Sequence, residues 1–185
     1  GTGMRRWAVV GLALAAKIAS GGAPEALSGA YVHAGGEAET QAVAAAVDQA
    51  VKAMNMLARP IARPRLQHAT RAWESFTLTI HTNAVRFTRP GRPDFAVALG
   101  GAAAEWIGDD GKSYQASFAA AEDGTVTQTV TAEDGGRVQV FALGADGSTL
   151  TVATTVNSPK LKKPLTYQRT YRRRDSGERD PAPQT

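Results

Sequence analysis

A two-residue alternation of apolar and polar positions runs along the chain from Trp73 onward. In residues 73–82 the apolar Phe76, Leu78 and Ile80 are separated by threonines, a pattern typical of a strand with one buried face. Nine further short runs predict strands: 27–33, 84–89, 93–99, 103–107, 112–120, 125–132, 136–143, 148–156 and 165–172. The chain is therefore expected to be mainly β, with about ten strands.

Asp-Gly dipeptides separate several of these runs. They occur at 110–111, 123–124, 134–135 and 146–147. Because both residues tolerate the positive φ angles of tight hairpins, we expect the strands to follow one another in antiparallel up-and-down order. A flat meander would leave two unpaired edges, and closure into a barrel removes them. The predicted fold is an antiparallel up-and-down β-barrel.

One helical pattern interrupts the strands, between the first and the second. Residues 37–58 carry an apolar stripe at helical spacing, and Pro60 is expected to end the helix at or before Arg59. A further helical turn over 61–66 is interrupted by Pro64. The stripe consists of Val43, Val47, Val51, Met54, Leu57 and Ile61. We expect one helical lid, inserted after the first strand, with this stripe facing the barrel mouth.

The N-terminus has the pattern of a secretory signal peptide, predicted over residues 1–23. Met4-Arg5-Arg6 is a cationic start, residues 7–16 are apolar, and small residues follow. The apolar run is too short for a bilayer, which needs about 20 residues. The alternative is an uncleaved amphipathic helix. Residues 24–174 form the predicted barrel and the polar residues 175–185 a disordered tail, and the protein is expected to be secreted or periplasmic.

Composition narrows the class of function. The chain of 185 residues has no cysteine, which excludes disulfides, a thiol nucleophile and a Cys-ligated metal. Its net charge of +4 is too weak and too scattered to predict binding to nucleic acid. Aromatic residues make up 6% of the chain and hydrophobic residues 43%, so alanine, valine and leucine are expected to fill most of the core.

No catalytic or metal-binding pattern stands out. The chain contains no Gly-x-Ser-x-Gly, no His-Glu-x-x-His and no glycine-rich phosphate loop. His33, His68 and His81 are scattered along the chain, and the adjacent pairs of acidic residues lie in predicted hairpin turns. The sequence therefore predicts a protein that is not an enzyme and that holds no cofactor and no metal.

The last strand carries the best candidates for ligand binding. Tyr167, Arg169 and Tyr171 share one face by the period of two. If this face points inward, Arg169 is a cation in a largely apolar barrel and needs a partner. A ligand carboxylate is one candidate, with Tyr171 as a second donor. The alternative is structural: Arg169 packs across an aromatic ring or bonds to backbone carbonyls at the barrel floor.

Two groups of basic residues complete the candidate chemistry. They are Arg59, Arg63 and Arg65 after the helix, and Lys160, Lys162 and Lys163 before the last strand. A solvated surface explains both groups. The functional alternative is a transient contact with an anionic membrane, from which an apolar ligand is taken.

These patterns resemble the fatty-acid-binding proteins of the calycin superfamily, over about residues 27–173. Gly29-Ala30-Tyr31 is similar to the Gly-x-Trp of that family's first strand, and Ala58-Arg59-Pro60 resembles the close of its helical lid. The run of Asp-Gly turns matches its hairpin rhythm. Arg169-Thr170-Tyr171 looks like its terminal Arg-x-Tyr, which implies that Arg169 and Tyr171 hold a fatty-acid carboxylate.

The chain also departs from that family in two places. The family has two short helices where one long helix is expected here. It often has a second internal arginine where this chain has Phe141 or Ala142, so the carboxylate grip is expected to be incomplete. A lipocalin, the nearby alternative, would place its main helix after the strands.

The resemblance implies a binding or transport protein for a small apolar or amphipathic ligand such as a fatty acid. The alternative is a non-catalytic envelope interaction or inhibitor protein with a filled barrel core. Core volume distinguishes the two, because alanines that face inward would leave room for a ligand. The strand region is rich in them: Ala96, Ala98, Ala102, Ala103, Ala104, Ala116, Ala119, Ala120 and Ala121.

Overall fold

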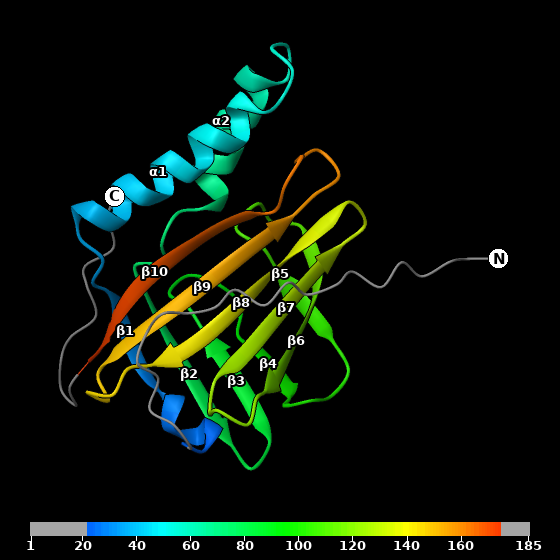
Figure 1. The fold of residues 1–185 in the computed structure, drawn as a ribbon. Helices are drawn as coiled ribbons and strands as arrows, with labels where there is room; N and C mark the ends of the chain where they lie inside the picture. The colour runs from blue at the N-terminus through cyan, green and yellow to red at the C-terminus, as the bar shows by residue number, and fades with distance from the viewer. Residues whose placement is uncertain (1–21, 175–185) are drawn as a thin grey trace.

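The computed structural model describes residues 22–174, which form ten antiparallel strands curled into a nearly closed barrel (Figure 1). The predicted signal peptide, up to residue 21, and the predicted tail, 175–185, lie outside the described residues. The strands are β1 (Gly29–His33), β2 (Ser75–His81), β3 (Ala84–Thr88), β4 (Phe95–Ala98), β5 (Ala104–Ile107), β6 (Ser113–Ala120), β7 (Val126–Ala132), β8 (Gly135–Leu143), β9 (Thr149–Asn157) and β10 (Leu165–Arg173). The predicted mainly β barrel is confirmed.

The sheet has one closing pair and one gap. Its order is β4-β3-β2-β1-β10-β9-β8-β7-β6-β5, so the first strand pairs with the last. No ladder joins β4 to β5. The end of β4 is held to β6 instead, where the Gly100 amide donates a hydrogen bond of 2.7 Å to the carbonyl of Phe118. Closure therefore leaves only two short strands with free edges, which limits edge pairing between molecules.

The segment between β1 and β2 contains two helices, α1 (Glu37–Lys52) and α2 (Arg59–Ala69), so the prediction of one long helix was wrong. The reason lies in Pro60. At the start of a helix a proline loses no hydrogen bond, and its fixed φ suits the first turn. Pro60 therefore begins α2 rather than ending α1, and the side chain of Asn55 accepts a hydrogen bond of 2.9 Å from the Ala58 amide just before it. Pro64 lies within α2.

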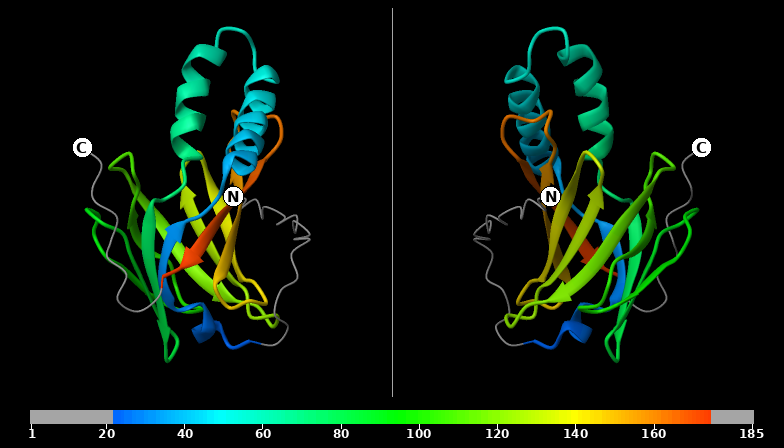
Figure 2. Two further views of the ribbon diagram at one scale, coloured as in Figure 1. Left: turned by 90° about the vertical axis from the view of Figure 1, so that its left-hand side faces the viewer. Right: turned by 90° about the vertical axis from the view of Figure 1, so that its right-hand side faces the viewer.

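The two helices form a hairpin that rises from one end of the barrel (Figure 2). Val43, Val47 and Val51 of α1 are buried against Leu165 and Tyr167 of β10. The first half of the predicted stripe therefore packs at the barrel, on its β10 side. The second half does not, because Leu57 is 89% exposed and Ile61 is 58% exposed, at the far end of the hairpin. No helix in residues 22–174 is long and apolar enough to cross a membrane.

The opposite end of the barrel is closed by a short 3-10 helix, η1 (Pro24–Leu27). Leu27 is buried, and its carbonyl oxygen accepts a hydrogen bond of 2.6 Å from the hydroxyl of Tyr31. Above this floor the barrel is filled with rings in mutual contact. They belong to Tyr31, Trp73, Phe76, Phe87, Phe95, Trp106, Phe118, Phe141 and Tyr171.

Alanine, valine and leucine make up most of the buried apolar residues in 22–174, as expected, but the aromatic rings form the centre of the barrel. Few as they are, the aromatic residues are concentrated inside the barrel. Of the nine strand-region alanines, Ala116 is buried, Ala104 is half-buried and the others are exposed. The alanines that were expected to leave room for a ligand therefore mostly face solvent, and rings in mutual contact occupy the lower barrel.

Candidate functional site

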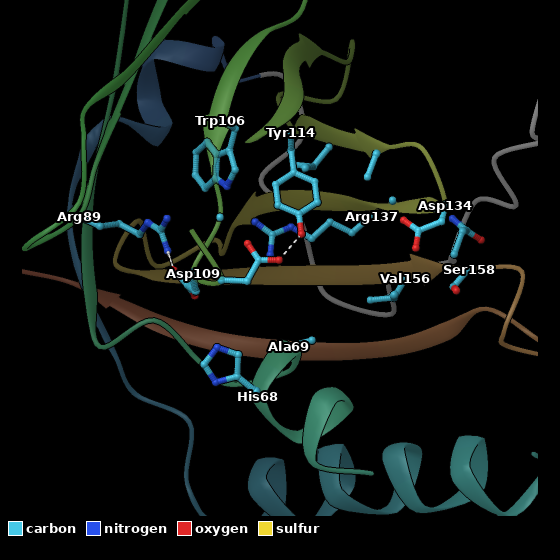
Figure 3. Close-up of a pocket in the computed structure, with 17 residues that line it drawn as sticks. His68, Ala69, Arg89, Trp106, Asp109, Tyr114, Asp134, Arg137, Val156 and Ser158 are labelled. Atoms are coloured by element: carbon cyan, nitrogen blue, oxygen red, sulfur yellow. Dashed lines mark hydrogen bonds and ion pairs between the residues drawn. The ribbon is translucent and has the colours of Figure 1, made fainter. Parts of the chain in front are cut away.

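A cavity of about 290 Å³ lies at the barrel end that carries the helices, between the upper ends of β5 to β9 and the last turn of α2 (Figure 3). We call it the mouth cavity. Its lining is a mixture of apolar walls and charged groups: His68, Ala69, Arg89, Trp106, Gly108, Asp109, Asp110, Tyr114, Val130, Ala132, Asp134, Gly135, Gly136, Arg137, Val156, Asn157 and Ser158. Its volume is just below the lower limit of ordinary small-molecule pockets, which is about 300 Å³.

Arg137 is the central charged group of this cavity. It lies on the inner face of β8, in register between Val130 of β7 and Val156 of β9. Its guanidinium lies 5.8 Å from the ring centroid of Trp73 and 5.9 Å from that of Trp106. Within residues 22–174 it forms no hydrogen bond and no ion pair, and its Nε is shielded from solvent. Burial lowers the pKa of Arg137; the positive charge of Arg89 acts in the same direction, and Tyr167, Tyr114 and the carboxylate of Asp109 oppose it.

Arg89 contrasts with Arg137 because its charge is neutralised. Its side chain is 9% exposed and donates a hydrogen bond of 2.8 Å to the carboxylate of Asp109. Its guanidinium lies 4.9 Å from the ring centroid of Trp106 and 5.6 Å from that of Trp73. The two arginines thus share two indole rings, an arrangement that favours cations, but only Arg89 has a carboxylate.

Tyr114 supplies a hydroxyl at the same level of the barrel. It donates a short hydrogen bond to Asp110 (Figure 3). Burial, followed by this bond to a carboxylate, raises the pKa of Tyr114 to about 12. Burial alone would raise the pKa of Asp110, but the hydrogen bonds from Tyr114 and from the Lys112 amide outweigh it and lower that pKa. At neutral pH the pair is therefore a protonated phenol bonded to an ionised carboxylate.

A row of polar side chains lies one layer deeper. Gln128, Gln139, Thr154 and Tyr167 are paired in register across β7, β8, β9 and β10. The amide nitrogen of Gln139 donates a hydrogen bond of 3.2 Å to the hydroxyl of Thr154. Neither side-chain amide atom of Gln128 has a partner among the described residues. Buried polar groups are nearly always hydrogen-bonded in folded proteins, so the unpartnered amide of Gln128 is unusual. The polar row lies between the charged mouth and the aromatic floor.

The three residues predicted from the last strand all face inward, next to this polar row. Arg169 donates hydrogen bonds of 2.6 and 3.2 Å to the carbonyl of Thr70, and lies 3.6 Å from a carboxylate oxygen of Glu39. The Tyr171 hydroxyl accepts a hydrogen bond of 3.2 Å from the Trp73 amide, and burial raises the pKa of Tyr171. The Tyr167 hydroxyl lies 3.5 Å from the carbonyl of Ala69, to which it donates.

Arg169, Tyr167 and Tyr171 line an inner cavity of about 20 Å³, which Arg137 also lines. That volume accommodates a water molecule and no larger ligand. The hydrogen bonds of Arg169 to the Thr70 carbonyl join the segment after α2 to the barrel. A bond to a backbone carbonyl is what the structural alternative for Arg169 predicted. Whether these three residues also contact a ligand stays a prediction.

The main residues of the mouth cavity, Arg137, Arg89 and Trp106, were not predicted from the sequence. A signal for Arg137 was present, because it shares the period-two face of Gln139 and Phe141. The family resemblance puts the second internal arginine at Phe141 or Ala142, and Arg137 lies two periods of the alternation before Phe141 on β8. The same signal was present for Arg89, because the predicted strand 84–89 puts it on the face of Val85 and Phe87, although β3 ends at Thr88.

Histidines and acidic residues are not gathered into a metal site in residues 22–174. His33 pairs with Glu39 at 2.7 Å, His68 is exposed at the rim of the mouth cavity, and His81 is exposed at the other end of the barrel.

Comparison with known proteins identifies the fold. No family model and no curated protein matches the chain in sequence. Three solved structures each superimpose with a TM-score of 0.50. A mutant of the fatty acid transporter REP1-NXSQ is 12% identical, over 80% of this chain and 97% of its own. Lipid binding protein 8 of Caenorhabditis elegans is 12% identical, over 80% and 96%. A fatty acid binding protein of Schistosoma mansoni, in complex with arachidonic acid, is 16% identical, over 83% and 100%.

Identities this low show a shared fold and nothing finer. The two helices after the first strand and the nearly closed ten-strand barrel are the features held in common. The chain therefore has a fold similar to that of the fatty acid binding proteins.

Proposed function

We propose that this protein binds a small amphipathic ligand in the mouth cavity, and that it does so without catalysing a reaction. One observation carries the proposal: Arg137 forms no hydrogen bond and no ion pair within the described residues, in a cavity walled by Trp106, Val130 and Val156. The fold similarity to fatty acid binding proteins supports lipid-like ligands as a class.

The physical reason is the cost of an unpaired cation. Arg137 is half-buried and its Nε is shielded from solvent, so it has lost part of its hydration without gaining a partner, which is unfavourable. An anionic ligand group would provide a charge-assisted hydrogen bond of about 1.5–3 kcal/mol. The apolar walls would hold the rest of the ligand. Arg169 and Tyr171 are proposed as a second, deeper contact for the same anionic group, as the terminal Arg-x-Tyr suggests.

A paired titration tests this proposal. Dodecanoic acid and its methyl ester are compared for displacement of a fluorescent apolar probe from the wild-type protein. The acid should bind at least about tenfold more tightly, because only the acid offers a partner to an arginine. Equal affinities would leave generic apolar binding, and binding of neither compound would remove the proposal.

A second candidate function is supported by the filled core. Since aromatic rings occupy the lower barrel, the barrel could be a rigid support for a non-catalytic interaction or inhibitor surface. This candidate predicts that neither dodecanoic acid nor its methyl ester displaces the fluorescent probe in a saturable way. It also predicts that a substitution that fills the mouth cavity leaves the binding of a protein partner unchanged.

The hairpin tip supports a transient contact with an anionic membrane as an accessory to ligand exchange. Met56, Leu57 and Ile61 are exposed there. The adjacent groove, between the hairpin and the β9–β10 loop, is bordered by Lys52, Arg59, Arg65, Lys160 and Lys162. Apolar tips with a basic collar suit an anionic interface. Leu57→Asp should reduce sedimentation with phosphatidylglycerol vesicles, whereas phosphatidylcholine vesicles should retain neither the wild type nor the variant.

Export is proposed from the N-terminal pattern alone. The described fold narrows the cleavage site, because Leu27 is buried and the carbonyl of Ala26 accepts a hydrogen bond from Arg173. Cleavage before Pro24 keeps these contacts, and cleavage after Leu27 would remove them. N-terminal sequencing of protein from the producing cell should find a start between residues 16 and 24. An intact N-terminus in a cytoplasmic fraction would contradict export.

A further inference from the structure

A groove of about 830 Å³ lies outside the barrel, between the helical hairpin and the loop that joins β9 to β10 (Figure 1). We call it the hairpin groove. Its apolar lining includes Met54, Ile61, Ala62, Leu66, Val156 and Leu161. Val156 and Ser158 also line the mouth cavity, so the two hollows are neighbours, and the hairpin groove is the larger.

The charged side chains that line the hairpin groove are all cations. They are Lys52, Arg59, Arg65, Lys160 and Lys162, and no aspartate or glutamate of residues 22–174 joins them. Lys52 pairs with Asp48 at 2.9 Å. Arg65 on α2 and the two lysines of the β9–β10 loop form no ion pair in the described chain. Both walls of the groove therefore carry positive charge that the protein itself does not neutralise.

Local hydrogen bonds hold both walls in place. In the loop, the carbonyl of Ser158 accepts a hydrogen bond of 3.0 Å from the Leu161 amide, and its hydroxyl accepts one of 3.2 Å from the Lys160 amide. Leu161 is half-buried against the apolar cluster at the base of α1. At the hairpin, the guanidinium of Arg59 donates bonds of 3.2 and 2.9 Å to the carbonyls of Met54 and Lys52. The groove is therefore preformed, which lowers the cost of binding.

The hairpin groove suits a helix better than a strand. An added strand needs a free sheet edge, but β9 is paired with β8 and β10, and β10 is paired with β9 and β1. Recognition then depends on side chains, as when an amphipathic helix lays its apolar face in a groove. Two turns of a helix about 10 Å in diameter occupy roughly 850 Å³, which is close to the volume of the groove.

The position of the hairpin groove favours a protein segment over a bilayer. Met56 and Leu57, which are exposed at the hairpin tip, do not line the groove. A flat bilayer can contact that tip, whereas the groove is bounded by a wall on each side. A second copy of this chain is also a poor occupant, because the chain has a net charge of +4 and like charges repel.

We propose that the hairpin groove docks an acidic amphipathic helix of a partner protein. Apolar residues of that helix pack against Ile61, Ala62 and Leu161, and its carboxylates face Arg65, Lys160 and Lys162. This interaction surface goes beyond ligand binding in the mouth cavity and does not depend on it, so the two can fail separately.

Peptide binding to the full chain tests the docking. The probes are fluorescein-labelled peptides of about 14 residues, since shorter helices are marginal in water. They carry leucine at helical spacing and glutamate beside each leucine, and scrambled peptides of the same composition are the control. Fluorescence anisotropy should show saturable binding of the amphipathic peptides, at least about tenfold tighter than that of the scrambled ones and weaker at high salt. Equal affinity for both kinds of peptide, or no binding of either, would overturn the proposal.

Substitutions locate the bound peptide. Lys160→Glu combined with Lys162→Glu should weaken its binding about tenfold or more, because two attractions become repulsions. The matched control is Lys163→Glu, since Lys163 is exposed on the same loop but does not line the groove. It should change the affinity by less than about threefold. If the control weakens binding as much as the double substitution, the attraction is non-specific and the proposal is overturned.

Two substitutions on the hairpin separate the groove from the tip. Ile61→Asp should weaken peptide binding about tenfold and leave the melting temperature almost unchanged, because Ile61 lines the groove and is 58% exposed. Leu57→Asp should leave peptide binding unchanged, because Leu57 lies outside the groove. Unchanged affinity in Ile61→Asp would overturn the proposal.

Two other occupants give different results. Sedimentation velocity should find the wild-type chain monomeric, and self-association that Ile61→Asp abolishes would assign the groove to a second copy. Phosphatidylglycerol vesicles should not displace the peptide from Leu57→Asp, in which the tip contact is removed. Displacement that persists in Leu57→Asp would assign the groove to a lipid surface. Either result would overturn the assignment to a partner helix.

Discussion

The two ends of the barrel differ in the residues that the same strands point inward: apolar residues at one end, and charged and polar residues at the other. At the η1 end the inner positions are aromatic and aliphatic, and the hydroxyl of Tyr31 is bonded to Leu27. At the helical end the inner positions of the same strands carry Arg137, Gln139 and Tyr114, and several polar atoms have no partner in residues 22–174. Strand β8 shows the change within five residues, from Arg137 through Gln139 to Phe141.

This difference indicates which end stabilises the fold and which end is available for binding. Close-packed rings contribute dispersion and hydrophobic stabilisation. Buried polar groups without partners oppose folding and tend to occur where a protein has another task. Four substitutions, taken from the largest expected effect to the smallest, test this division.

The closed end should be the most sensitive to truncation. Phe141 is fully buried and its ring contacts Phe76, Phe87 and Phe118. Phe141→Ala should lower the free energy of unfolding by about 3–5 kcal/mol, because it removes a large apolar side chain and leaves a cavity. Urea unfolding followed by tryptophan fluorescence measures the loss. A loss below about 1 kcal/mol would mean that the aromatic layer is not the stabilising part of the molecule.

The helical hairpin offers a second comparison, between its base and its tip. Val51 is fully buried, whereas Leu57 is 89% exposed on the same sequence stripe. Val51→Asp should destabilise the protein by a few kcal/mol, about 2–4, because it buries a carboxylate without a partner. Leu57→Asp is the matched control and should change the melting temperature very little. Equal effects of the two substitutions would show that α1 does not pack on β10.

Arg169 tests the boundary between the two ends. Arg169→Gln removes both hydrogen bonds to the Thr70 carbonyl. It also removes the cation beside the carboxylate of Glu39, whose side chain is only 13% exposed. A loss of about 1–3 kcal/mol in the free energy of unfolding is expected from such contacts. Ligand titration separates the two roles. A loss of stability without loss of selectivity for an acid over its methyl ester would assign Arg169 to the structure alone.

The fold was largely predictable because its signals are local. Residues 165–172 alternate without interruption and were predicted as a strand, and the structure has Leu165–Arg173. The four Asp-Gly dipeptides were predicted as hairpin turns, and the side chains of Asp110, Asp123 and Asp146 accept hydrogen bonds from amides two residues on. The helices were predicted less well, because Pro60 is compatible with either the end of one helix or the start of another.

The site was less predictable because it depends on contacts between distant segments. Period two places Arg169 on an inner face, but nothing in the sequence shows that the carbonyl of Thr70 lies 2.6 Å away. In the same way, Asp109 neutralises Arg89 across 20 residues, while Arg137 has no such neighbour in the described chain. Which arginine lacks a partner is decided by tertiary packing, and the unpartnered one is the candidate for binding.

The smallest expected effect is a pH dependence at the mouth. The pKa of Tyr114 is raised to about 12 from 10.0 in the unfolded chain. A group whose pKa is higher in the folded state stabilises the fold fully below its unfolded pKa, and this contribution is lost as pH rises through the folded value. The stabilisation from Tyr114 should therefore be complete below about pH 10 and disappear as pH approaches about 12.

Tyr114→Phe isolates this contribution from that of the buried Tyr31, Tyr167 and Tyr171, whose pKa values are also raised by burial. The tyrosinate absorbance of the folded variant should lack one step near pH 12, and its stability should fall less steeply between pH 10 and 12 than that of the wild type. At neutral pH the variant leaves the carboxylate of Asp110 without its phenol donor, so a small loss of stability is expected there. If the step that the variant lacks lies near pH 10 instead of near pH 12, Tyr114 ionises at its ordinary pKa. The hydrogen bond between Tyr114 and Asp110 would then not persist in solution. The difference between the apolar floor and the polar mouth would depend on Arg89 and Arg137 alone.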